Sequence, residues 1–111
     1  WYLKFLGGTS KVDAWVSLGG PNHGTNWAYG CWWQACYDMR PGSEFLNTLN
    51  AGDETPGYVR YGTWWSPCDG IINPDESVLL SGATNTRTAC IGHNSLPTDR
   101  TVARQVVSFS N

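Results

Sequence analysis

Two short segments of the chain place an acid and a histidine directly after strand-like runs. Asp69 ends the segment Trp-Trp-Ser-Pro-Cys-Asp at residues 64–69, and His93 ends the segment Cys-Ile-Gly-His at residues 90–93. A histidine whose second ring nitrogen faces a carboxylate is held in one tautomer and can act as a general base. Such a base activates a serine hydroxyl for attack on a carbonyl carbon. The two residues therefore predict two members of a serine hydrolase triad.

The nucleophile is missing from this pattern. In α/β-hydrolases the chain order is Ser, Asp, His, and the serine occupies a G-x-S-x-G turn. No such motif occurs in the 111 residues, and residues 1–6 have the character of the last turns of a helix that Gly7 and Gly8 close. We interpret residues 1–111 as the C-terminal portion of a single hydrolase domain whose N-terminal part carries the serine. On its own, this portion is expected to be marginally stable and inert.

Other readings of these residues stay open. Asp69 lies in the turn-favouring sequence Pro-Cys-Asp-Gly and could be a loop carboxylate in an Asx turn, and His93 could be an exposed loop histidine. Two rival acids are Asp75, in a turn-like segment, and Asp99, at a helix cap. His23 is an alternative base in a glycine-rich turn, and we interpret it as a structural residue or one at the rim of the site.

Composition excludes several classes of protein. The chain is 41% hydrophobic and 14% charged, with 13 Gly and 6 Pro, which is typical of one small globular domain with many turns. The net charge is −2 and the basic residues are scattered, so no nucleic acid partner is expected. No apolar run approaches the roughly 18 residues that a membrane-spanning helix requires. A domain without a transmembrane segment is predicted.

The four cysteines match no zinc spacing, and only two histidines are present to complete a metal site. Of the three possible disulfide connectivities, we favour Cys31 with Cys36 and Cys68 with Cys90, which would tie the loop of the acid to the loop of the histidine. Two disulfides predict an oxidising compartment and hence secretion. The alternative is a cytosolic protein with four reduced thiols. No cofactor or metal site is expected, and no calcium site is evident.

Strand-like and helix-like segments alternate along the chain. The prediction is a strand at residues 11–18, an irregular surface segment at 27–40, a helix at 44–50, a strand at 58–65, a weaker segment at 71–80, a strand at 86–91, and a last helix that Thr98 or Asp99 caps. About twenty residues separate the last two strands, enough for the crossover that parallel neighbours require. The expected fold class is therefore α/β, with a parallel sheet flanked by helices.

Seven tryptophans are many for a chain of this length. Trp15 and Trp64 alternate with polar neighbours in the predicted strands and are expected in the core, whereas Trp27, Trp32 and Trp33 are expected to face outward. Exposed aromatic faces stack on sugars and enter apolar interfaces. These three side chains suggest an acyl pocket or lid. They also suggest a competing function, a secreted lipid- or glycan-binding module without catalytic activity.

Four segments together resemble a known family. They are Trp-Val-Ser-Leu-Gly-Gly-Pro-Asn-His-Gly-Thr at 15–25, Tyr-Gly-Thr-Trp-Trp-Ser-Pro-Cys-Asp at 61–69, Ser-Gly-Ala-Thr-Asn at 81–85 and Cys-Ile-Gly-His at 90–93. In these residues the chain resembles the secreted actinobacterial, Streptomyces-type triacylglycerol lipases of the α/β-hydrolase family. The resemblance implies Asp69 as triad acid and His93 as triad base. It also implies a lipid or ester substrate, together with a G-H-S-x-G-G elbow and oxyanion donors that residues 1–111 lack.

Overall fold

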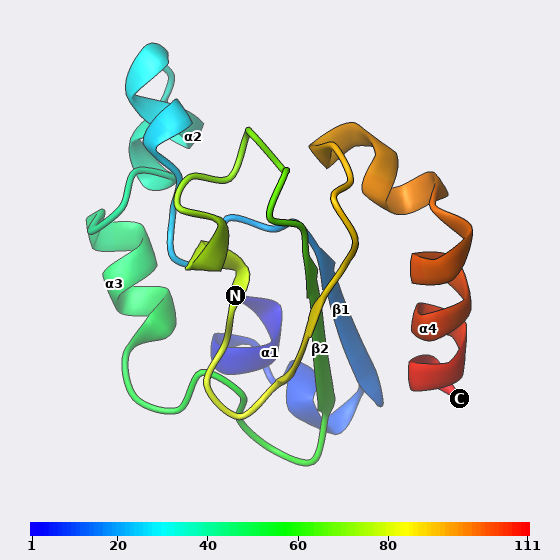
Figure 1. The fold of residues 1–111 in the computed structure, drawn as a ribbon. Helices are drawn as coiled ribbons and strands as arrows, with labels where there is room; N and C mark the ends of the chain where they lie inside the picture. Colours follow the sequence, from blue (N-terminus) through cyan, green and yellow to red (C-terminus); the bar gives the residue numbers. More distant parts are fainter.

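Three strands run parallel in one sheet, in the order β1-β2-β3. Figure 1 shows helices on both sides of β1 and β2. The computed structural model describes residues 1–111. The strands are β1 (Ala14–Leu18), β2 (Arg60–Trp65) and β3 (Thr84–Arg87). The α-helices are α1 (Tyr2–Phe5), α2 (Gln34–Asp38), α3 (Glu44–Asn50) and α4 (Arg100–Ser110), and the 3₁₀ helices are η1 (Gly8–Ser10), η2 (Asn26–Gly30), η3 (Asp75–Val78) and η4 (His93–Thr98). The predicted parallel α/β arrangement is confirmed.

The third strand lies earlier than predicted. We expected it at residues 86–91, but β3 spans Thr84–Arg87, and its pairing with β2 ends at Trp65 opposite Arg87. The hydrophobic pattern placed this strand too late in the chain, because β3 is a largely exposed edge strand of polar residues, Thr-Asn-Thr-Arg. The more apolar residues that follow leave the sheet, because a disulfide and the Ser66 side chain bind them instead.

Helix α4 packs against the sheet and supplies its core on that side (Figure 1). Trp64 of β2, Leu96 of η4 and Val102 of α4 are fully buried together. Phe109 meets the Trp64 ring edge-on at 5.6 Å between centroids. The helix begins where Asp99 accepts a hydrogen bond from the Val102 N–H, at 2.9 Å. Asp99 is therefore the helix cap that its sequence position predicted, and it is unavailable as a rival catalytic acid.

The segment at 27–40 is more regular than predicted. Helix η2 and helix α2 fall within or across it, and the Cys31–Cys36 disulfide joins them. Helices of five residues are too short to show a hydrophobic periodicity in the sequence. Here η2 begins at the cap that the Thr25 side chain provides, and the disulfide holds α2 near the end of η2. In the weaker segment at 71–80 the only helix is η3. None of the helices is both long and apolar enough to cross a membrane.

The tryptophans divide largely as expected. Trp64 is buried, while Trp27, Trp32 and Trp33 are exposed, the last two at 75% and 74%. Trp15 is only half-buried, because β1 is an edge strand, and it packs beside Tyr61 with 5.9 Å between ring centroids. The expectation that Trp15 is a core residue was wrong to that extent.

Candidate active site

Asp69 lies in the loop that follows β2, with its side chain only 2% exposed. Its Oδ1 accepts hydrogen bonds from the backbone N–H of Ile71 at 2.9 Å and of Ile72 at 2.8 Å. The first of these is the Asx turn that the Pro-Cys-Asp-Gly sequence favours. Hydrogen bonds from N–H groups to a carboxylate are strong and hold its orientation. The turn therefore fixes the acid and leaves Oδ2 for another partner.

That partner is His93, the first residue of η4. Its Nδ1 lies 2.8 Å from Oδ2 and 3.0 Å from Oδ1 of Asp69, and its backbone N–H donates to the Asp69 carbonyl at 3.3 Å. A carboxylate at this distance selects the tautomer with the proton on Nδ1 and leaves Nε2 as the proton acceptor. The imidazole is 28% exposed, and Nε2 makes no hydrogen bond within the chain. The structure thus brings together the two residues that the sequence singled out.

Gly19, just after β1, completes the packing around this pair. Its φ of +60° lies in the left-handed region, and a Cβ there would lie 2.9 Å from Asp69 Oδ2, 3.2 Å from His93 Nδ1 and 2.8 Å from a Leu96 methyl carbon. Both the backbone conformation and the space require glycine. The ends of β1 and β2 therefore converge on one point, the carboxyl edge where open parallel sheets place their sites.

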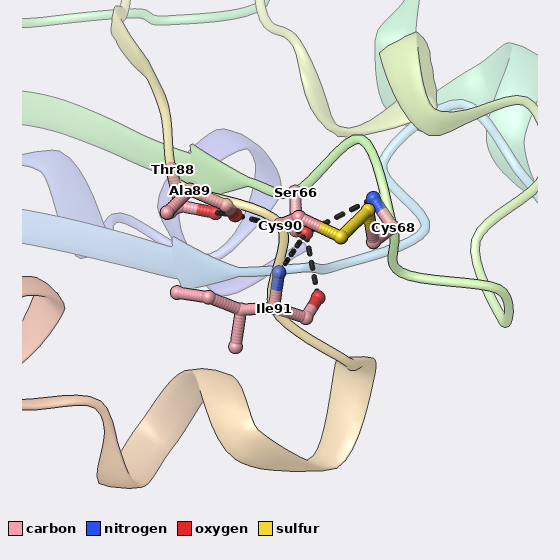
Figure 2. The surroundings of a disulfide bond; sticks show 6 residues. All are labelled: Ser66, Cys68, Thr88, Ala89, Cys90 and Ile91. Atoms are coloured by element: carbon pink, nitrogen blue, oxygen red, sulfur yellow. Dashed lines mark hydrogen bonds between the residues drawn. A yellow bond between two sulfur atoms is a disulfide. The ribbon is translucent and has the colours of Figure 1, made fainter.

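The loops of the acid and the histidine are joined twice, as Figure 2 shows. The disulfide Cys68–Cys90 links them covalently. Beside it, the buried Ser66 hydroxyl accepts from the N–H groups of Cys68 (3.1 Å) and Ile91 (2.9 Å) and donates to the Ile91 carbonyl (2.6 Å). Both expected disulfides, this one and Cys31–Cys36, are present.

An open apolar hollow of about 300 Å³ lies beside the imidazole of His93. Its apolar lining comes from the end of β1, from the η2–α2 segment and from the loop after Asp69, and includes Leu18, Pro21, Trp27, Met39, Ile71 and Ile72. Concave sites with apolar walls and few polar groups are the ordinary form of small-molecule sites. His93 is therefore part of the lining of a space suited to an apolar substrate.

The other candidate residues, His23 and Asp75, do not join the Asp69–His93 pair. His23 Nε2 lies 3.2 Å from Glu54 Oε1, and its Nδ1 faces the side-chain amide of Asn50 at 3.4 Å, so it is held apart from the Asp69–His93 pair. Burial, followed by the nearby charges of Glu76 and Asp69, raises the pKa of Asp75, which makes no contact with either histidine.

Neither a nucleophile nor a metal centre accompanies the pair. No serine hydroxyl hydrogen-bonds to His93, and the hydrogen-bonding capacity of Ser66, the serine nearest in sequence to Asp69, is fully used by backbone groups. No group of three or more His, Cys, Asp and Glu side chains is placed to hold a metal ion.

Sequence reasoning missed Gly19, Thr25 and Ser66, although all three support the site. Gly19 follows a strand as part of a Gly-Gly pair, which is a signal for a special backbone conformation. For Thr25 and Ser66 the sequence carries no such signal, because the carbonyls to which they donate, those of Ile71 and Ile91, lie 46 and 25 residues away.

No protein-family model and no curated protein matches the chain. Among solved structures, the crystal structure of Aspergillus fumigatus lipase B is similar, with a TM-score of 0.60 and 20% sequence identity. The similarity covers 78% of this chain and 24% of the lipase chain, so this chain spans about a quarter of that protein's length. At this identity the comparison shows the fold alone. The chain therefore has an α/β fold that it shares with part of a fungal lipase.

Proposed function

We propose that the chain is the C-terminal portion of a secreted carboxylic ester hydrolase, a triacylglycerol lipase, in which His93 and Asp69 are the base and acid of a serine triad. The observation that carries the proposal is the 2.8 Å contact between His93 Nδ1 and Asp69 Oδ2, with Nε2 free beside an apolar hollow. The lipase-like fold and the two disulfides support it. Disulfides persist in oxidising compartments, which agrees with secretion.

In the proposed reaction, His93 Nε2 removes the proton from a serine Oγ as that oxygen attacks the ester carbonyl carbon. The imidazolium then donates this proton to the leaving alcohol oxygen, and an acyl-enzyme remains. Water, deprotonated by the same nitrogen, attacks the acyl carbon, and the proton returns to the serine as the carboxylic acid leaves. Asp69 orients the imidazole and stabilises its charged form throughout. The serine and the oxyanion donors belong to the N-terminal part of the same protein.

The apolar hollow favours an acyl chain as the group that binds next to His93. Its walls are Leu18, Trp27, Met39 and the two isoleucines after Asp69, and no Lys, Arg, Asp or Glu side chain lines it. Burial of methylene groups against such walls contributes about 0.8 kcal/mol for each group. An ester with an aliphatic acid is therefore the proposed substrate class.

Labelling with a phosphonate ester tests the proposal in the complete protein that contains this chain. The reagent forms a stable bond to activated serines, and intact mass followed by peptide mapping locates the adduct. We expect one adduct on a serine N-terminal to residue 1, and no adduct after His93→Ala substitution. An adduct on a serine within residues 1–111 would refute the placement of the nucleophile, and the absence of any adduct would count against the hydrolase.

A second candidate function, a secreted lipid- or glycan-binding module, is favoured by the exposed Trp27, Trp32 and Trp33. It needs no serine and leaves Asp69 and His93 as ordinary loop residues. Tryptophan fluorescence titrated with lipid vesicles or oligosaccharides, in a protein that takes no phosphonate, would support this function. Serine labelling that depends on His93 would exclude it.

A further inference from the structure

The hydroxyl of Thr25 connects the wall of the apolar hollow to the loop that holds Asp69. Thr25 is 5% exposed and lies between β1 and η2. Its Oγ1 donates to the Ile71 carbonyl at 2.5 Å and accepts from the N–H groups of Asn73 at 3.1 Å and Trp27 at 3.3 Å. A threonine hydroxyl has one donor and two acceptor positions. All three are therefore used, and none is left for a substrate.

One peptide group joins this hydroxyl to the proposed triad. The carbonyl of Ile71, which accepts from Thr25, and the N–H of Ile72, which donates to Asp69 Oδ1 at 2.8 Å, belong to the same planar unit. A hydrogen bond at the carbonyl fixes the tilt of that plane and polarises the N–H at its other end. The donor that orients the carboxylate is thereby set by Thr25.

The same hydroxyl also orders the hollow. Through the Trp27 N–H it fixes the start of η2, and Thr25, Trp27 and Ile71 all line the cavity beside His93. The backbone supports the arrangement, because the Thr25 N–H donates to the Met39 carbonyl at 2.8 Å and the Asn26 N–H to the Asn73 carbonyl at 2.8 Å. Asp69 and the cavity wall therefore share one buried hydrogen-bond centre.

We propose that Thr25 is a positioning residue of the hydrolase, which acts through the peptide between residues 71 and 72 to hold Asp69 in line with His93. This inference rests on the proposed function for its catalytic readout. Its spectroscopic readout depends on the geometry alone, so the inference about Thr25 and the proposed function can fail separately.

Three variants of the complete protein test the inference. Thr25→Val keeps the shape and removes the hydroxyl, and Thr25→Ser keeps the hydroxyl and removes the methyl group. Thr63→Val is the matched control, because Thr63 is a fully buried threonine whose hydroxyl donates to Asn85 Oδ1 at 2.7 Å, apart from the Asp69 loop. Thermal unfolding of each variant reports how far the loss of a buried hydroxyl lowers the Tm, so that a loss of activity can be compared with a loss of stability.

The catalytic readout is hydrolysis of a soluble short-chain p-nitrophenyl ester. We expect Thr25→Val to lower kcat about tenfold or more with little change in KM, because a misplaced catalytic group slows the chemical step. Thr25→Ser and Thr63→Val should keep kcat within about threefold of the wild type. Wild-type kcat in Thr25→Val, or an equal loss in Thr63→Val, would overturn the inference.

The spectroscopic readout is the downfield proton resonance of the His93 Nδ1–H, assigned by its loss in His93→Ala. It should broaden or shift upfield in Thr25→Val and stay in place in Thr25→Ser and Thr63→Val. An unchanged resonance in Thr25→Val would contradict the inference even in a protein without esterase activity. If Thr25→Val does not fold, Thr25→Ala replaces it, since a smaller side chain leaves room for water. A kcat and a resonance equal to those of the wild type in Thr25→Ala would also contradict the inference.

Discussion

At the scale of single residues, Asp69 divides its two carboxylate oxygens between two tasks. Oδ1 binds the turn that follows it, and Oδ2 lies closest to the histidine. The sequence predicted the pair, because both residues follow strand-like runs and the chain order matched a triad. It could not predict Gly19 or Thr25 as their support, because those contacts depend on how distant loops fold together.

Replacement of Gly19 by alanine should disturb the pair. The substitution forces a left-handed φ on a residue with a Cβ, which costs about 1–3 kcal/mol, and it crowds Asp69 Oδ2 at 2.9 Å. Gly42→Ala is the control, since Gly42 has a φ of +77° and open space around the missing Cβ. We expect both variants to lose stability in urea unfolding and only Gly19→Ala to lose esterase activity. Equal activity in the two variants would show that the close approach of Gly19 is unimportant.

The pKa of Asp75 predicts a pH-dependent change in stability. Burial, followed by the charges of Glu76 and Asp69, raises the pKa of Asp75 above the ordinary value of 3.8. The Asp75 carboxyl therefore holds its proton more tightly in the folded protein than in the unfolded chain. Stability therefore falls as pH rises from 3.8 through the raised pKa, and ionised Asp75 is unfavourable at neutral pH. Asp75→Asn should stabilise the protein in urea unfolding at pH 7 and lose this advantage near pH 3. A stabilisation that is the same at both pH values would contradict the assignment.

At the scale of elements, the parallel order of β1, β2 and β3 brings the loops after the strands to one edge. The first two strands and the helices α3 and α4 were predictable, because their apolar residues recur at strand or helix spacing and their caps are visible in the sequence. The position of β3 was not, since an exposed edge strand needs no apolar residues. The short helices between residues 26 and 38 depend on the Thr25 cap and a disulfide rather than on periodicity.

The two disulfides should differ in their contribution to stability. The Cys68–Cys90 bond closes a loop with a sequence separation of 22, and the Cys31–Cys36 bond one of 5. If a disulfide stabilises the folded protein by lowering the entropy of the unfolded chain, the two bonds contribute about 3 and about 2 kcal/mol, respectively, to the free energy of unfolding. Double alanine variants of each pair, unfolded in urea, should therefore lose stability in that order. A larger loss on removal of the Cys31–Cys36 bond would contradict the entropic account.

At the scale of the whole molecule, the aromatic surface of the η2–α2 segment consists of the exposed side chains of Trp27, Trp32 and Trp33, and Trp27 also lines the hollow. The arginine in this region, Arg40, is bound to neighbouring groups. It donates to the carbonyls of Ala28 and Cys31 and lies 4.1 Å from the ring centroid of Tyr37. Exposed aromatic side chains of this kind suit the boundary between water and apolar phases. The fold class followed from the sequence, whereas the place of Trp27 in the lining of the hollow is visible only in three dimensions.

Loss of the aromatic surface should affect aggregated substrate more than soluble substrate. We expect the Trp32→Ala, Trp33→Ala double variant to hydrolyse an emulsified long-chain ester several-fold more slowly than the wild type, while its rate on a soluble short-chain ester stays unchanged. Tyr58→Ala is the control, because Tyr58 is fully exposed but precedes β2, towards the opposite edge of the sheet. An equal effect of the control, or an equal loss on both substrates, would exclude a role in contact with the lipid phase.

The most direct test of the triad assignment is the kcat of ester hydrolysis by the complete protein with His93→Ala or Asp69→Asn, beside the wild type. Removal of the base, or of the carboxylate that sets its tautomer, typically lowers kcat about 10⁴-fold in such triads. We predict a loss of that order for both variants, with the fold retained by circular dichroism. Turnover within about tenfold of the wild type in either folded variant would contradict the central claim that His93 and Asp69 are the base and acid of this enzyme.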